Sequence, residues 1–404
     1  MHATALRTMR ILTAAAVLPL GAWLAGGGTT AQAAAARRAP HAGAKRSVFH
    51  VTRILSGTML EHSFTPKGGG KRRTEKLADP DDITRLGQQL FVGFQNGVGP
   101  EGEPSVDGNT RSTVVELTES GRVVAQWDIT GKCDGLTAYP QEGSVIATVN
   151  EDANSSLYLI DPSASRRGQV THYRYSAPLP HHGGTDAISD YRGQLLISAS
   201  APGTTGRPAP QRSYPAVYTV TLDPYDRLAT AAPLFYDEAT ATIANLGRRH
   251  GRSDPLALTD PDSSEVVPMS RGRFGGDFVL DSQGDRQQIY VRDAGRFDER
   301  LSVLALSQSI DDTAWPTQTV GRLFSTDSSN DAVDVVTGHF RAGQAFAVAT
   351  PCGANGAPAT CPAPPKYPAN FLASLDLWTG KLAHVAVDGV AYVPQGGLAF
   401  VPGR

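Results

Sequence analysis

The chain has 404 residues, with 37 Lys and Arg against 39 Asp and Glu and a formal net charge of −2. The charges nearly cancel and there is no long basic block, so the sequence gives no electrostatic reason to expect binding to nucleic acid or to an anionic membrane surface. The 42 glycines and 28 prolines, with 40% hydrophobic residues, suit a packed core joined by many turns.

The first 33 residues have the three parts of a secretory signal peptide. Arg7 and Arg10 precede the apolar run ILTAAAVLPLGAWLAG, and Ala31-Gln32-Ala33 offers small residues for cleavage. The run is shorter than the roughly 20 residues that a membrane-spanning helix needs. We therefore expect a signal peptide over 1–33, a disordered tail over 34–46, a secreted product, and no membrane span after cleavage.

A short acidic pattern then recurs before strand-like segments. It occurs as Asp81-Asp82-Ile83-Thr84, Asp134-Gly135-Leu136-Thr137 and Asp186-Ala187-Ile188-Ser189, with a weaker copy at Asp312-Thr313-Ala314-Trp315. The first three copies begin 53 (134 − 81) and 52 (186 − 134) residues apart. Each copy is followed by a glycine and a β-rich run, including VGRLFSTD after the fourth. Two further strand-like segments complete each unit.

Four short strands per unit, repeating every 40–55 residues or so, are typical of propeller blades. The sequence therefore predicts an all-β fold, a single β-propeller of six or seven four-stranded blades over 47–404. Helical periodicity is scarce, and DEATATIANLG at 237–247 is the one stretch in which we expect a short helix.

The two ends of this region look like halves of one blade. GGLAFVP at 396–402 reads as an inner strand with no outer partners after it, whereas VFHVTRIL and MLEHSF near residue 50 read as outer strands with no inner partners. Joining them would remove two exposed sheet edges. We therefore expect N- and C-terminal strands to close the propeller in one blade.

Segments such as LASLDLWTGKLAHVAV and PQGGLAFVP carry a family resemblance. The chain resembles the secreted bacterial β-propellers of the NHL, YVTN and SMP-30-like groups over residues 47–404. The SMP-30-like resemblance implies a metal-dependent hydrolase or lactonase with its site at the central channel. The Glu and Asn metal ligands of that group find no residue-by-residue match here.

Acidic residues provide one set of candidate binding residues. If the recurring motifs begin the inner strands, several carboxylates ring the channel entrance: Asp82, Asp134, Asp186, Asp260 and Asp312. Such a ring would suit Ca²⁺ or another divalent cation, although no cofactor is firmly implied. The metal candidates are Asp134, Asp186, Asp260 and Asp262. In the alternative, each Asp caps its own turn, and TDPDSSE is an acidic hairpin turn.

The segment LPHHGGTDAIS provides the candidate catalytic residues His181, His182 and Asp186. Adjacent histidines beside an Asp could supply metal ligands or a general base. In the alternative, one histidine is exposed and the other hydrogen-bonded, because neighbours on an extended chain point in different directions.

Three long Gly/Pro-rich insertions, at 96–110, 201–215 and 352–368, each join a predicted second strand to a third. They should therefore share one face, where Tyr214, Tyr367 and Arg212 are candidate contact residues. Cys352 and Cys361 bracket a short loop and are expected to form a disulfide. Cys133 is left over, either as a small buried residue beside a strand or as a reactive thiol.

The common hydrolase, zinc-protease and redox motifs are absent from the sequence. This absence and the long loops favour a binding module, a monomer that captures an extracellular protein, peptide, glycan or small molecule. The alternative is the metal-dependent hydrolase or lactonase, which would use Asp134, Asp186, His181 and His182.

Overall fold

The computed structural model describes residues 49–180, 182–202, 214–269, 272–350 and 370–403. The predicted signal peptide, the tail at 34–46, and His181, Arg212, Tyr367, Cys352 and Cys361 lie outside these ranges. In the described part of the chain, no helix has the length and apolar character needed to cross a membrane.

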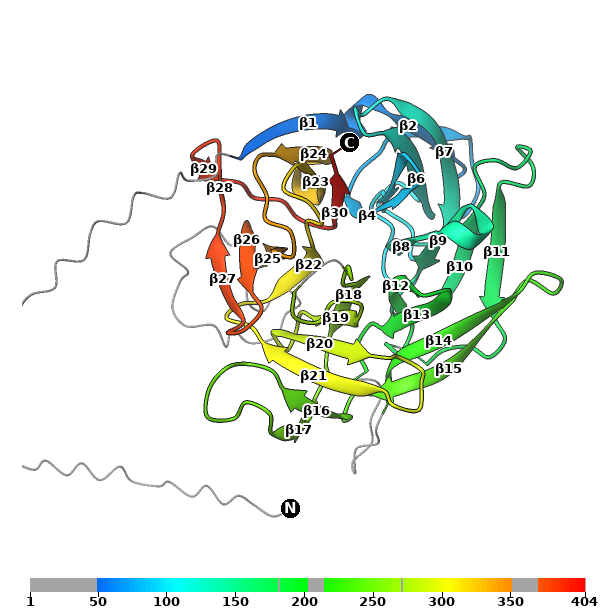
Figure 1. The fold of residues 1–404 in the computed structure, drawn as a ribbon. Helices are drawn as coiled ribbons and strands as arrows, with labels where there is room; N and C mark the ends of the chain where they lie inside the picture. The colour runs from blue at the N-terminus through cyan, green and yellow to red at the C-terminus, as the bar shows by residue number, and fades with distance from the viewer. Residues whose placement is uncertain (1–48, 181, 203–213, 270–271, 351–369, 404) are drawn as a thin grey trace, which may run out of the picture. The chain divides into compact units, whose positions relative to one another are not determined.

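Six inner strands stand in a circle around a central channel (Figure 1). Each contacts the next, and the last contacts the first again. In order they are β4 (Pro80–Leu86), β8 (Cys133–Tyr139), β12 (Thr185–Tyr191), β18 (Pro261–Val266), β22 (Ile310–Ala314) and β30 (Leu398–Pro402). The predicted β-propeller is therefore confirmed, and the described residues form six blades of at least four strands each.

Four blades are built from consecutive antiparallel strands. Outside β4 lie β5 (Gln89–Phe94), β6 (Arg111–Thr118) and β7 (Val123–Thr130). Outside β8 lie β9 (Ser144–Val149), β10 (Ser156–Ile160) and β11 (Val170–Tyr175). Outside β12 lie β13 (Gln194–Ala199), β14 (Pro215–Asp223) and β15 (Leu228–Tyr236). Outside β18 lie β19 (Phe278–Ser282), β20 (Gln287–Arg292) and β21 (Arg300–Ala305).

The hydrophobic core lies between neighbouring blades. Phe91 and Val114 of the first blade pack with Leu136, Val145 and Tyr158 of the second, for example. All six residues of β9 are buried, so the strand SVIATV does not alternate between polar and apolar residues. The second strand of a blade is covered on both faces by neighbouring blades, so its residues form a continuous buried run.

The last two blades are not sequential. β22 pairs with β25 (Ala345–Ala349), followed by β26 (Phe371–Asp376) and β27 (Lys381–His384). The hairpin of β23 (Gly321–Asp327) and β24 (Ala332–Thr337) lies between β22 and β25 in sequence but belongs to the next blade. The prediction that VGRLFSTD belongs to the same blade as the inner strand before it is therefore wrong. β22 pairs with β25, and the hairpin between them in sequence pairs in the next blade.

The closing blade contains strands from both ends of the chain. Its order is β1 (His50–Ser56), β24, β23 and β30, so the predicted closure is confirmed (Figure 1). Arg53 Nε lies 3.1 Å from Asp334 Oδ1, and the Tyr392 hydroxyl donates to Asp334 Oδ2 at 3.1 Å. The segment MLEHSF is not part of this blade, because β2 (Glu61–Phe64) pairs only with β3 (Arg73–Lys76).

The helix expected at 237–247 is not formed. Its central residues are β16 (Thr240–Ile243), which pairs with β17 (Ser253–Pro255) and runs parallel to β21. The β-branched residues Thr240, Thr242 and Ile243 suit an extended strand better than a helix.

Candidate cation site at the channel mouth

The inner strands share an irregularity near their first residues. Between β4 and β5 the register moves from Pro80 opposite Phe94 to Ile83 opposite Val92, so that two residues oppose one. A corresponding extra residue occurs at the start of β8, β12, β18 and β22. Such β-bulges re-aim side chains at the rim of a closed sheet. Here they occur where the acidic residues lie.

The first bulge position carries aspartate in five blades. Its occupants are Asp81, Asp134, Asp186, Asp262 and Asp311, and all five line one cavity. The predicted fourth copy of the motif, which starts at Asp312, is therefore shifted by one residue. Asp311, not Asp312, is the structural counterpart of Asp81.

Gly396 precedes β30 at the corresponding place in the sixth blade. Its φ is +119°, and an added Cβ would lie 2.7 Å from the Asp81 carbonyl oxygen and closer still to Thr326 Oγ1. No side chain fits there, so the ring of carboxylates has one gap.

The second bulge position contains the predicted residues Asp82 and Asp312, which bond to backbone. Asp82 accepts hydrogen bonds from the N–H of Ile83 and of Leu136, both at 2.6 Å. Asp312 accepts from Thr313 N–H at 2.7 Å and from Leu398 N–H at 2.6 Å. Each carboxylate thus caps its own strand and also bridges to the next blade.

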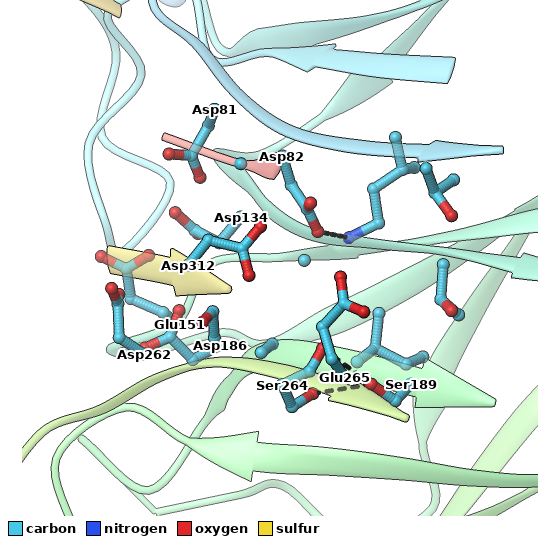
Figure 2. A pocket seen from close by; sticks show the side chains of 18 of the residues that line it. Asp81, Asp82, Asp134, Glu151, Asp186, Ser189, Asp262, Ser264, Glu265 and Asp312 are labelled. Carbon is cyan, nitrogen blue, oxygen red and sulfur yellow. Dashed lines mark hydrogen bonds between the residues drawn. The ribbon is translucent and has the colours of Figure 1, made fainter. Parts of the chain in front are cut away.

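The cavity enclosed by these strands has a volume of about 970 Å³ (Figure 2). Among the described residues, its wall contains twelve acidic residues and two strong bases, Arg85 and Lys132. The predicted residues that line it are Asp82, Asp134, Asp186, Asp260, Asp262, Asp312 and His182. Tyr214 is not among the lining residues; its backbone N–H donates to Asp237 Oδ1 at 2.8 Å.

Three of the acidic residues are close enough to share one ion. Asp134, Glu151 and Asp186 each offer a carboxylate oxygen, and these oxygens lie within 4.8 Å of one another. Asp134 is 6% exposed, and its Oδ2 is buried without a hydrogen-bond partner in the described structure. An unpartnered buried carboxylate oxygen requires a cation, a proton or a water, so the triad can accept a bound cation at this oxygen.

One basic side chain enters the triad. Lys132 Nζ lies 2.7 Å from Asp134 Oδ1 and from Glu151 Oε1. Gln95 Nε2 donates to the same Asp134 oxygen at 3.0 Å. For the carboxylate of Asp186, the described residues provide no hydrogen-bond donor.

Burial and mutual repulsion make the channel costly to ionise. Burial raises the pKa of Asp186 well above its usual range, and the negative charges of Glu151 and Asp134 add to this effect. Burial also raises the pKa of Asp82 to about 6, although two backbone N–H groups oppose the shift. Burial alone would lower the pKa of Lys132, but Asp134 and Glu151 hold it well above its ordinary value. The site thus favours any ligand that brings positive charge.

The donor set matches a hard cation. Carboxylate oxygens are the ligands that Ca²⁺ prefers, in sets of six to eight oxygens that include backbone carbonyls and waters. Among the described residues, the cysteine Cys133 is a soft ligand, but it is fully buried in the core between the first two blades. Burial raises the pKa of its thiol well above the usual value, which disfavours a thiolate ligand.

A histidine lies on the wall of the same cavity. His182 Nδ1 lies 2.8 Å from Asp152 Oδ1, which also accepts a hydrogen bond from Ser200 Oγ at 2.8 Å. His182 has a φ of 58°. The pair has the arrangement of a base held by a carboxylate.

Several lining residues were missed by sequence reasoning. Glu151, like Gln95 and Gln283, follows the second strand of its blade, and these positions surround the mouth. Aligning the ends of the second strands could have revealed them. Asp262 and Glu265 lie on the inner strand β18, so the interpretation of TDPDSSE as a hairpin turn is wrong for both.

The sequence matches no protein-family model and none of the curated proteins. Among solved structures it is similar to a periplasmic gluconolactonase of Pseudomonas aeruginosa, with 13% identity, a TM-score of 0.41, and coverage of 87% of this chain and 99% of that one. It is also similar to a functionally unknown protein from Desulfotomaculum acetoxidans, with 11% identity, a TM-score of 0.42, and coverage of 89% and 100%.

A third similar structure is an auxiliary nutrient binding protein from Bacteroides thetaiotaomicron, with 11% identity, a TM-score of 0.38, and coverage of 73% of this chain and 78% of that one. All three TM-scores lie below 0.5. These likenesses therefore carry no argument about function.

Proposed function

We propose that this protein is a cation-binding β-propeller whose channel mouth holds a hard divalent ion, with Ca²⁺ as the best fit. The observation that carries the proposal is the triad of Asp134, Glu151 and Asp186, in which Asp134 Oδ2 is buried and unpartnered. Asp81 and Asp262 of the same ring add carboxylates around it.

The cavity is far larger than one ion. A volume of about 970 Å³ lies in the range of small-molecule sites, about 300–1,000 Å³. An ion in the triad would leave room for a ligand with oxygen atoms of its own. The proposed role is therefore to capture an oxygen-rich molecule through a bound cation, as a secreted monomer that acts as a binding module.

Metal-dependent hydrolysis is the second candidate, and the pair of His182 and Asp152 on the cavity wall favours it. A bound divalent cation would supply Lewis acidity toward a carbonyl oxygen. In this scheme His182 takes a proton from the water that attacks the carbonyl carbon and gives it to the leaving oxygen as the ester C–O bond breaks, and Asp152 holds the imidazole in position. A lactone would be a suitable substrate class.

One described connection at this mouth supports capture of a ligand. The segment from Gln95 to Thr110 joins β5 to β6, and Gln95 itself lines the cavity. Within the segment, Glu101 N–H donates to Glu103 Oε2 at 2.7 Å. We propose that this segment helps to select the partner.

Calorimetric titration with CaCl₂, metal analysis, and thermal melts with and without EDTA test the proposal. We expect one ion per chain, and an Asp186→Asn variant that binds it at least about tenfold more weakly. Asp107→Asn is the matched control, because that side chain is 65% exposed and lies outside the cavity. Absence of binding and of any EDTA effect would refute the cation site.

The two candidate functions separate in an assay of lactone hydrolysis. Turnover that requires the cation and His182 supports the hydrolase. Cation binding without turnover of any lactone supports the binding module.

A further inference from the structure

The proposed cation site already contains a positive charge of its own. Lys132 Nζ lies 2.7 Å from Asp134 Oδ1 and 2.7 and 2.8 Å from the two oxygens of Glu151. The Lys132 side chain is only 19% exposed, so it forms part of the cavity wall. An ion on the same oxygens would lie within a few ångströms of this ammonium.

We propose that Lys132 is a tethered competitor for the cation: its ammonium neutralises Asp134 and Glu151 and must turn away before a divalent ion can bind to them. This inference rests on the proposed function, because it takes the triad to be the cation site. Lys132 then determines how tightly, and for which ions, the site binds.

The backbone holds Lys132 in place while its side chain remains able to turn. Its N–H donates to Asn150 Oδ1 and its carbonyl accepts from Asn150 N–H, both at 2.9 Å. The preceding Gly131 packs closely, because an added Cβ would lie 2.5 Å from the same Asn150 oxygen. The ammonium can therefore move only by rotation of its four-carbon stem, without movement of the blade.

The channel offers the displaced ammonium another partner. Asp81, the ring residue of the preceding blade, also attracts Lys132 electrostatically. The described residues give the Asp81 carboxylate no hydrogen-bond donor, because the bonds to Asp81 from Thr326 and Gly397 reach its backbone oxygen. Lys132 can thus leave Glu151 without losing all carboxylate contact.

The competition selects ions by charge. A sodium or potassium ion carries the same charge as the ammonium but lacks its tether, so it gains little by replacing Lys132. A divalent ion gains about twice the Coulomb energy from the same carboxylates at equal distance. The site should therefore bind Ca²⁺ in the presence of Na⁺, and should lose this discrimination without Lys132.

The test uses the full mature chain with CaCl₂ as the probe, and compares Lys132→Met and Lys132→Gln with Lys132→Arg, which keeps the charge. We expect both neutral variants to bind Ca²⁺ at least about tenfold more tightly than the wild type, and to be weakened by added NaCl. Their melting temperatures should fall in EDTA and recover in CaCl₂.

Two variants serve as controls. Lys132→Arg keeps the positive charge, so it should not show the tighter Ca²⁺ binding of the neutral variants, and Lys76→Met should keep the wild-type affinity to within about threefold. Lys76 is a matched control because its Nζ lies 2.7 Å from Glu61 Oε1 in an ion pair whose side chains are 53% and 56% exposed.

The outcomes separate this inference from the proposed function. Equal affinity in wild type and neutral variants overturns the role of Lys132 and leaves the cation site intact. Binding only by the neutral variants supports the role of Lys132 and refutes cation binding by the wild type. Absence of binding in every variant overturns both. A neutral variant that stays unfolded even in CaCl₂ also overturns the inference, since the ion should replace the lost charge.

Discussion

Neighbouring residues on the same inner strands have opposite environments. Asp82 and Asp312 each accept two backbone N–H groups and bridge to the next blade. Asp81 and Asp186, at the preceding bulge position, receive no hydrogen bond on their carboxylates from the described residues and face the cavity. The comparison teaches that one step along a bulged strand separates a carboxylate that joins blades from one that is available to a ligand.

pH offers the broadest way to test this comparison, because acid protonates the carboxylates at both positions. Burial raises the pKa of Asp82 from 3.8 to about 6 and raises the pKa of Asp186 well above its usual range. A raised pKa in the folded state gives stability that is complete below the unfolded pKa and is lost as the pH rises through the folded value. We therefore expect the free energy of unfolding in EDTA to fall between about pH 4 and pH 7, by up to about 3 kcal/mol for Asp82.

Urea denaturation at several pH values measures this effect. CaCl₂ should flatten the dependence at neutral pH, where the carboxylates are ionised. A stability in EDTA that rises from pH 5 to pH 7 would contradict the assignment of uncompensated charge to the channel.

Asp312→Ala tests the bridging position alone. It removes the acceptor of the Thr313 and Leu398 N–H groups and leaves both donors without that partner. We expect a loss of about 2–4 kcal/mol in the free energy of unfolding. Asp312→Asn keeps an acceptor oxygen and should lose less than half as much. Equal losses in the two variants would mean that charge, not hydrogen bonding, is what matters here.

Asp186→Asn tests the cavity-facing position. Because it removes one of several repelling charges and breaks no hydrogen bond of its carboxylate, we expect stability in EDTA to change by less than about 1 kcal/mol. Its cost should be seen in Ca²⁺ affinity instead. A loss of stability as large as that of Asp312→Ala would remove the distinction between the two positions.

His182→Gln should have the smallest effect on stability. The side chain is partly exposed at the rim, so we expect a change below about 0.5 kcal/mol and unaltered Ca²⁺ affinity. Loss of lactone hydrolysis in this variant, with binding intact, would favour the hydrolase. A large fall in Ca²⁺ affinity would instead make His182 part of the cation site.

The fold was predictable because its unit repeats. The bulged start of each inner strand is visible as an aspartate motif, and the strand runs after it are apolar enough to recognise. The hairpin of β23 and β24 was not predictable, because pairing with the next blade leaves no local trace in the sequence. The helix expected at 237–247 failed because tertiary pairing overrode a mixed local preference.

The site was predictable only in part. Asp134 and Asp186 follow from the repeat, and both lie in the triad. Glu151 could have been found only by aligning the ends of the second strands, and Lys132 lies in a connection outside any repeated motif. Asp311 was missed because the weak fourth copy aligned equally well one residue later.

The closing blade has a consequence for biosynthesis. The ion pair between Arg53 and Asp334 spans 281 residues of sequence. A ribosome delivers β1 early, but its sheet is incomplete until β23, β24 and β30 have also been made. The nascent chain therefore carries an unpaired β1 while the intervening blades are synthesised, which exposes that edge to aggregation during this time.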